Sequence, residues 1–136
     1  MTDLLSLMFL LYLGNCGGQL TATATNQTIT SPGWPEKYPN NQRCAWFITS
    51  DTGRTIHMEF VKFDVEPNIE SQSNLRCAND YVIVDGPYQD TTKICNSNKH
   101  WALDLYEDEN QLRMYFYSNK ENQFNGFEAV FYASGE

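Results

Sequence analysis

Cysteine is the residue type whose chemistry is easiest to assign in this chain of 136 residues. The four cysteines are Cys16, Cys44, Cys77 and Cys95. None forms a C-x-x-C pair, and neither histidine lies at a zinc-finger spacing from them, which argues against a zinc site. An even number of cysteines, together with the secretion signal predicted below from the N-terminus, predicts two disulfides. Spacing alone leaves all three pairings open.

Carboxylates form the second group of candidate chemical residues. They crowd two stretches, one with Asp64, Glu66 and Glu70 and one between Asp104 and Glu109. Such runs usually form a solvated face. The net charge is −8 and there is no run of lysine or arginine, whereas nucleic acid and anionic membranes need clustered positive charge. Nucleic acid and anionic membranes are therefore poor partners for this chain.

Catalytic motifs are missing from the sequence. It has no G-x-S-x-G, no H-E-x-x-H and no P-loop. His57 lies in an alternating strand pattern that turns it to solvent, and His100 lies in a turn-rich stretch beside Trp101. Cysteines engaged in disulfides leave no thiolate nucleophile. The sequence therefore predicts a protein that is not an enzyme, with a carboxylate-based hydrolase as a remote alternative.

The N-terminus carries a short apolar run, LLSLMFLLYL, from Leu4 to Leu13. At about 1.5 Å per residue this run is too short for a bilayer core of about 30 Å, so it predicts no transmembrane segment. It is typical of the apolar region of a secretory signal peptide. We therefore expect a signal peptide over residues 1–14, one domain over residues 15–136, and secretion to the extracellular space. The alternative is a buried N-terminal strand or helix.

Period-two patterns dominate the rest of the chain and predict strands with one buried face. The runs that predict strands are Gln27–Thr30, Cys44–Thr49, Arg54–Val61, Asp80–Asp85, Thr92–Cys95, Leu112–Tyr117 and Phe127–Tyr132. Ser31–Pro39 holds three prolines and one glycine and cannot be a central strand. Trp46 and Phe47 are adjacent, so one of them must be at least partly exposed. The pattern favours an all-β antiparallel sandwich with a jelly-roll plan.

Six motifs occur in order along the chain, and together they resemble the CUB domain family. They are CGGQLTA (Cys16–Ala22), SPGWPEKYP with Asn41 (Ser31–Asn41), CAW (Cys44–Trp46), FVKFDVE (Phe60–Glu66), CANDYV followed by Asp-Gly (Cys77–Gly86), and the closing F-x-S with Gly-Phe (Phe116–Phe127). The resemblance covers Cys16 to Tyr132. It implies a CUB fold with the disulfide pairs Cys16–Cys44 and Cys77–Cys95.

The resemblance also implies a candidate calcium site. In one subset of CUB domains, the ligands occupy the positions held here by Tyr38, Glu66, Asp80 and Asn119. The fourth position is Asn instead of Asp, which removes one negative charge, and the long segment between Glu66 and Asp80 adds Glu70. In that subset the ion orders acidic side chains that grip a Lys or Arg of a protein partner. The alternative makes Glu66 and Asp80 rim residues that bind backbone amides.

The resemblance implies an extracellular protein-interaction module whose partner is a protein or glycoprotein. The alternative is a stand-alone secreted CUB domain, similar to the spermadhesins, that binds glycans. Asn26-Gln27-Thr28 is a sequon for N-linked glycosylation. The sequence thus predicts Asn26 as a glycosylation site on a secreted domain.

Overall fold

The computed structural model describes residues 16–66, 77, 79–85, 92–97, 101–104 and 110–135. Residues 1–14, predicted as a signal peptide, and Glu70 lie outside this part of the chain. The strands are β1 (Cys16–Thr21), β2 (Gln27–Thr30), β3 (Arg43–Thr49), β4 (Thr55–Val65), β5 (Tyr81–Asp85), β6 (Thr92–Ile94), β7 (Asn96–Ser97), β8 (Trp101–Asp104), β9 (Gln111–Tyr117) and β10 (Gly126–Ser134). No helix in the described ranges is long and apolar enough to cross a membrane.

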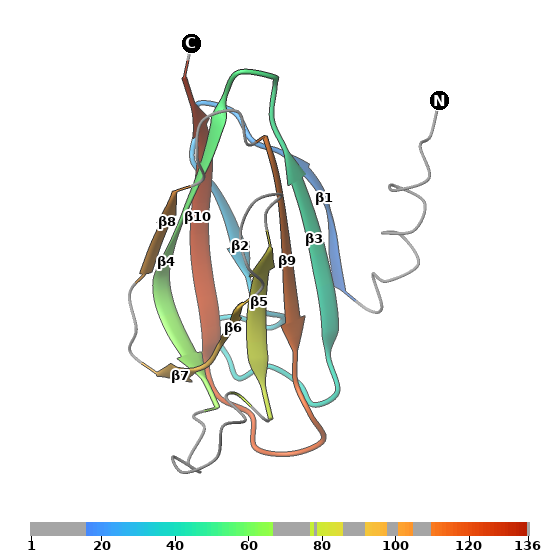
Figure 1. Cartoon of the computed structure of the whole chain (residues 1–136). Coiled ribbons are helices and arrows are strands. Elements are labelled where there is room, and N and C mark those ends of the chain that lie inside the picture. The colour runs from blue at the N-terminus through green and yellow to red at the C-terminus, as the bar shows by residue number, and fades with distance from the viewer. Residues whose placement is uncertain are drawn as a thin grey trace, which may run out of the picture.

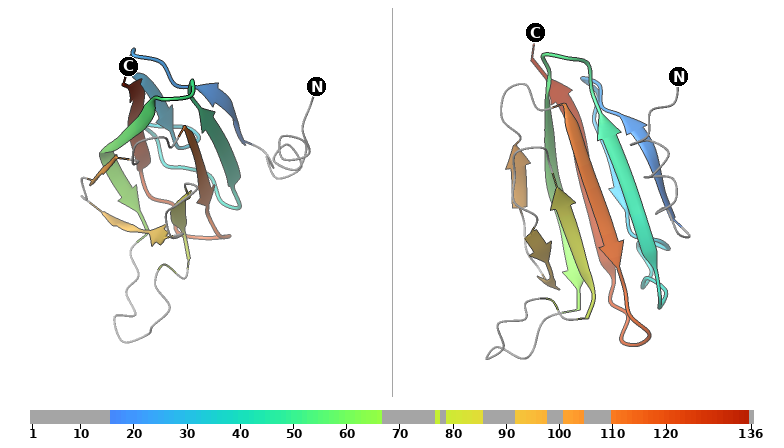
Figure 2. Two further views of the ribbon diagram at one scale, coloured as in Figure 1. Left: turned by 45° about the horizontal axis from the view of Figure 1, so that its top comes forward. Right: turned by 45° about the vertical axis from the view of Figure 1, so that its right-hand side comes forward.

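The strands form two packed layers, as the all-β sandwich prediction requires (Figure 1). The first sheet has the order β1-β3-β9-β5-β6, and the second has the order β2-β10-β4-β7, with β8 also paired to β4. The two views in Figure 2 show the layers lying face to face. Most neighbours are antiparallel, but β1 runs parallel to β3. This parallel pair was not predicted, because β1 holds two glycines and lacks a row of large apolar residues.

The core between the sheets is built from the apolar residues of the alternating patterns. Phe127 lies at its centre, with its ring in edge contact with Trp46, Phe60 and Phe116. Trp46 is buried and its neighbour Phe47 is partly exposed, as predicted for this pair. Aromatic pairs in this geometry stabilise a core beyond the apolar area that they bury.

Strand β4 is longer than predicted and contains an irregularity. The pairing with β10 shifts register between Glu128 and Ala129, so that Glu128 lies opposite Lys62 and Ala129 opposite Phe60. Val61 is the extra residue and is 41% exposed. Such a bulge bends a strand and resets which side chains face inward. The alternation is broken there, so the sequence pattern placed the end of the strand at Val61, whereas β4 continues to Val65.

Both disulfides join the residues that the family resemblance implies. Cys16 is bonded to Cys44, its register partner across β1 and β3, and Cys77 is bonded to Cys95. The first link holds the edge strand β1 on its sheet. The second joins the residues that flank β5 and β6. Each closes a loop whose entropy cost in the unfolded chain corresponds to about 3 kcal/mol of stabilisation.

Gly126 connects the core strand β10 to the Ser31 turn. Its φ is +101°, and a Cβ at this position would lie 1.9 Å from Ser31 Oγ. The absence of a side chain allows the Phe127 N–H to donate to Ser31 Oγ at 3.0 Å, while the Ser31 N–H donates to the Phe127 carbonyl at 3.1 Å. This close contact fixes the segment that leads from Ser31 to Tyr38.

Replacement of Phe60, Phe116 or Phe127 by alanine should lower the free energy of unfolding by about 3–5 kcal/mol each, because every truncation leaves a cavity in a packed core. Urea unfolding followed by circular dichroism measures the loss. Val61→Ala on the exposed bulge is the control and should change stability by less than about 0.5 kcal/mol. Near-wild-type stability of all three phenylalanine variants would contradict the register of these strands.

Candidate metal and ligand site

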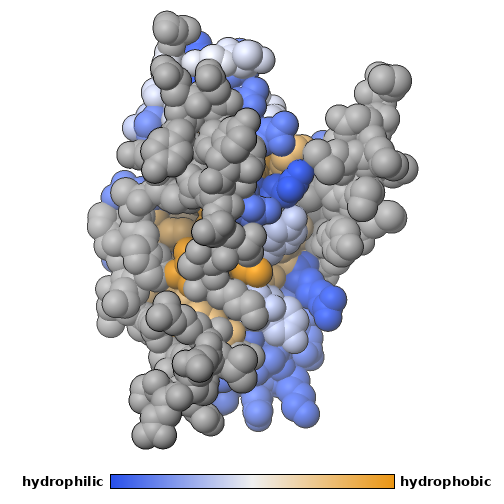
Figure 3. Space-filling model, in the orientation of Figure 1, coloured by the Kyte–Doolittle hydropathy of each residue, from blue (hydrophilic) through white to orange (hydrophobic). Residues whose placement is uncertain are grey.

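The four predicted site residues lie at the end of the sandwich where β4 and β9 finish and β5 begins, and these strand ends are at the bottom of Figure 1. Glu66 follows the last residue of β4, Asp80 precedes β5, and Asn119 comes two residues after β9. Tyr38 lies on the proline-rich segment between β2 and β3. In Figure 3 the described side chains at this end are hydrophilic. Strand direction therefore brings together residues that are far apart in the sequence.

Tyr38 is the central residue of the site. Its side chain is 1% exposed, and its ring packs edge-on against Phe116 with 5.0 Å between centroids. The hydroxyl donates to Asp80 Oδ2 at 2.7 Å and accepts from the Glu66 backbone N–H at 3.3 Å. Burial, and then the hydrogen bond and negative charge of Asp80, raise the pKa of Tyr38. The phenol therefore stays protonated and donates.

Asp80 is 1% exposed and uses both of its carboxylate oxygens. Oδ2 accepts from Tyr38, and Oδ1 accepts from the Asn119 backbone N–H at 2.7 Å. Burial raises the pKa of Asp80, and these two hydrogen bonds oppose the rise. The contact with the Asn119 amide is the one expected of a rim residue that holds a loop.

Glu66 differs from Asp80 because one of its oxygens is unsatisfied. The residue is 7% exposed, and Oε2 accepts from Asn122 Nδ2 at 3.3 Å. Oε1 is buried and has no hydrogen-bond partner. Burial raises the pKa of Glu66, and the negative charges of Asp80 and Glu121 raise it further. A buried carboxylate oxygen without a donor is costly, so this atom is a natural position for a cation or a donor from a ligand.

Asn119 is placed through its backbone, and its side chain faces its own loop. Its Oδ1 accepts from the Glu121 N–H at 3.1 Å. The loop is held by Ser118, whose Oγ donates to the Pro39 carbonyl at 2.9 Å and accepts from the Gln42 N–H at 2.9 Å. The structure thus joins the side chains of Tyr38 and Asp80 directly and places Glu66 beside them. Asn119 is connected to Asp80 by its backbone N–H.

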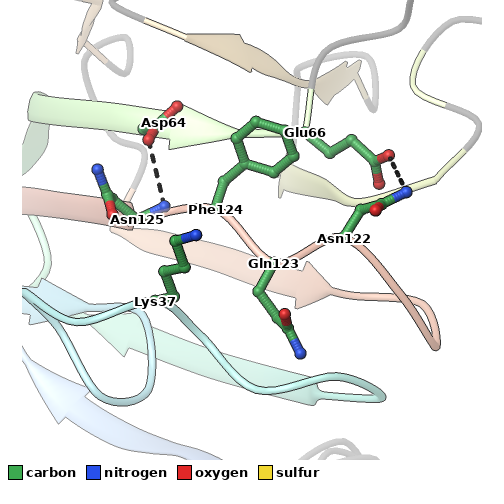
Figure 4. A pocket seen from close by; sticks show the side chains of 7 residues that line it. All are labelled: Lys37, Asp64, Glu66, Asn122, Gln123, Phe124 and Asn125. Atoms are coloured by element: carbon green, nitrogen blue, oxygen red, sulfur yellow. Dashed lines mark hydrogen bonds between the residues drawn. The ribbon is translucent and has the colours of Figure 1, made fainter.

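A pocket of about 440 Å³ opens beside Glu66 (Figure 4). It is lined by Lys37, Asp64, Glu66, Asn122, Gln123, Phe124 and Asn125. Asp64 Oδ2 accepts from the Asn125 N–H at 3.2 Å, which closes one wall. Sequence reasoning missed the loop residues that line the pocket, Asn122 to Asn125. A polar loop without periodicity carries no signal for which side chains point inward.

The donors at this end suit a hard cation in type. They are two carboxylates, a phenol and amide oxygens, which are ligands that calcium prefers, and they include neither sulfur nor imidazole. The unsatisfied Oε1 of Glu66 and the mutual repulsion of Glu66 and Asp80 both call for positive charge. Within the described ranges, however, no group of three or more His, Cys, Asp or Glu side chains is placed to hold a metal. A bound ion would therefore need carbonyl or water oxygens as well.

The raised pKa values of Glu66 and Asp80 predict a pH dependence of stability in chelator. The folded protein holds these protons above the ordinary pKa values of 4.5 and 3.8, so it binds more protons than the unfolded chain in that window. The contribution of these two groups to stability is therefore fully present below about pH 4 and is lost as pH rises through the raised pKa values. Urea titrations between pH 4 and 7 should show a smaller fall for Glu66→Gln than for wild type. Equal slopes for the two proteins would contradict this result.

The CUB domain family model matches residues 16–131. The zinc metalloproteinase nas-39 of Caenorhabditis elegans is 37% identical over 118 residues, covering 87% of this chain and 11% of that protein. Cubilin of Sus scrofa is 33% identical over 124 residues, covering 88% of this chain and 3% of that protein. The chain thus spans a small part of the curated relatives that it matches.

Solved structures agree on the fold. The MASP-1 CUB2 domain bound to Ca²⁺ has a TM-score of 0.73 at 22% identity, covering 86% of this chain and 99% of that one. The extracellular region of zebrafish Gpr126/Adgrg6 has a TM-score of 0.74 at 24% identity, covering 87% of this chain and 14% of that one. The disulfides, the sandwich and the family match lead to one conclusion: this chain belongs to the CUB domain family.

Proposed function

We propose that this chain is an extracellular, non-catalytic interaction domain that binds calcium at the end formed by Tyr38, Glu66, Asp80 and Asn119, and that holds a basic residue of a protein partner there. CUB domains are protein-interaction modules of extracellular proteins. The proposals of calcium binding and of a basic partner residue depend on the geometry of this chain's own site. We further propose that residues 1–14 direct the chain to the secretory pathway.

The observation that carries the proposal is the buried Oε1 of Glu66, which lacks a partner. A carboxylate that is 7% exposed and lies beside the negative charge of Asp80 needs compensation. A calcium ion would supply it, because it accepts six to eight oxygen ligands in flexible geometry. The solved MASP-1 domain is bound to Ca²⁺, so the fold accommodates this ion.

Glu66, Asp80 and Tyr38 would contribute side-chain oxygens, and the loop at Asn119 would contribute carbonyl or amide oxygens. The ion would supply the positive charge that orders this end. Asn in place of Asp removes one carboxylate, which favours an affinity in the weak extracellular range of about 0.1–1 mM. Tyr38, packed on Phe116, would keep its protonated hydroxyl fixed beside the bound ion.

The pocket beside Glu66 supports a basic partner residue. It opens to solvent, and its lining holds the two carboxylates of Asp64 and Glu66 against one cation, Lys37. Phe124 supplies an apolar wall for the methylene groups of a lysine or arginine side chain. The carboxylates would bind its charged end.

Calcium should stabilise the folded protein. At about 5 mM calcium the expected gain is about 1–2 kcal/mol over chelator, or several degrees in Tm, because the unfolded chain has no preformed site. Glu66→Gln and Asp80→Asn should abolish the gain, and Asn119→Asp should enlarge it by restoring one negative charge. Differential scanning calorimetry measures each case.

Glu59→Gln is the matched control for the calcium experiment. Glu59 is exposed on the same strand as the site-proximal Asp64, in the middle of the sheet opposite Val130. Its variant should keep the full calcium shift. If wild type shows no shift at this concentration and Asn119→Asp gains none, Glu66 and Asp80 are structural rim residues and the domain works without metal.

A lysine-containing peptide should bind the pocket more tightly in calcium than in chelator, and its norleucine counterpart should not bind in either. Amide chemical shifts of Asn122, Phe124 and Asn125 report the contact directly. Asp64→Asn should weaken the lysine peptide while leaving the calcium shift in Tm intact. Equal binding of both peptides would refute the basic-residue mode and turn attention to glycan ligands.

A further inference from the structure

The sequon Asn26-Gln27-Thr28 lies on an exposed turn of the fold. Asn26 and Thr28 are both exposed, on either side of the start of β2. The preceding turn is fixed by two hydrogen bonds, from the Thr25 N–H to Thr23 Oγ1 at 3.3 Å and from Gln27 Nε2 to the Thr21 carbonyl at 2.7 Å. The Asn26 side chain therefore has room for a large attached group without any change to the core.

We propose that Asn26 carries an N-linked oligosaccharide, and that this sugar covers the outer edge of β2. The inference rests on the proposed passage through the secretory pathway, where a lipid-pyrophosphate oligosaccharide is the donor. Asn26 Nδ2 forms one bond to the anomeric carbon of the sugar and loses one proton. The bond from that carbon to the lipid pyrophosphate breaks, and the pyrophosphate leaves with its electron pair.

The edge of β2 gives the sugar a structural role. In the described part of the chain, β2 pairs with β10 on one side and with no strand on the other. A free strand edge presents unpaired backbone groups that can pair with another chain. The edge strand of the facing sheet, β1, comes immediately before this turn in the sequence. A sugar at Asn26 is therefore attached on the side of the sandwich where both sheets have an edge strand.

The position of Asn26 leaves the ligand site open. Gln27 lies opposite Phe131, whereas the site end of β10 begins at Gly126 beside Ser31. Phe131 and Gly126 are five residues apart along β10, which corresponds to about 17 Å. The turn is also tied to the far end of β10, because the Ala133 N–H donates to the Thr23 carbonyl at 2.7 Å. The sugar would occupy the end of the sandwich away from Glu66 and Asp80.

To test this proposal, the full 136-residue chain is expressed in mammalian cells in two forms. One form has its own N-terminus, and the other follows an added cleavable secretion signal. Peptide N-glycosidase treatment in heavy-oxygen water, followed by peptide mass mapping, should find Asn26 converted to labelled aspartate in the secreted form. Asn26→Gln and Thr28→Ala should each lose the modification, and Thr28→Ser should retain part of it. Secreted chain with unmodified Asn26 in the signal-bearing form would overturn the inference.

Two further measurements separate this inference from the proposed function. If the form with its own N-terminus stays inside the cell while the signal-bearing form is glycosylated, secretion by residues 1–14 is wrong and the sugar site stands. The calcium shift in Tm should be the same with and without the sugar, and a changed shift would contradict its placement.

Enzymatic removal of the sugar should increase self-association of the protein, measured by light scattering. Unchanged association would overturn the proposal that the sugar covers the edge of β2.

Discussion

The buried hydroxyl of Tyr38 joins the hydrophobic core to the polar end of the domain. Its ring belongs to the aromatic core through Phe116, while its oxygen contacts the carboxylate of Asp80 and the backbone of Glu66. Its own N–H donates to the Phe124 carbonyl, which links it to the loop that lines the pocket. Each segment at this end is therefore positioned relative to one rigid side chain. The carboxylate of Asp80 and the backbone of Glu66 are thereby held beside the same hydroxyl.

The candidate site was predicted in part, and the difference has a physical reason. Tyr38, Glu66 and Asp80 flank strands or motifs with a strong pattern, so the family resemblance located them and the structure brings them together. Asn119 was expected to act through its side chain, yet it is its backbone N–H that contacts Asp80. Asn122 was missed entirely. Which side chain of a loop turns inward depends on its backbone path, and composition does not encode that path.

The fold followed more directly from the sequence, since alternation of buried and exposed residues is a local property. Strands such as β9 and β10 match their predicted ranges closely. Strand β1, which was not predicted, is stabilised by its neighbour β3 and has no alternation of apolar residues of its own. β1 depends on Gly17, where a Cβ would lie 1.9 Å from the Ala45 carbonyl oxygen, so its pairing requires the absence of a side chain. This close approach to β3 leaves no periodic signal in the sequence of β1.

The bulge at Val61 gives β4 one residue more than its partner without turning its apolar face away from the core. Phe60 and Phe63 are both buried although they are three positions apart, because Val61 and Lys62 together lie opposite Glu128. Removal of Val61 would leave Phe60, Lys62 and Phe63 opposite Ala129, Glu128 and Phe127 in regular alternation, and only the local bend would be lost. Natural variation at this point of the strand should therefore include loss of the residue as well as substitutions, with Phe63 facing the core in every case.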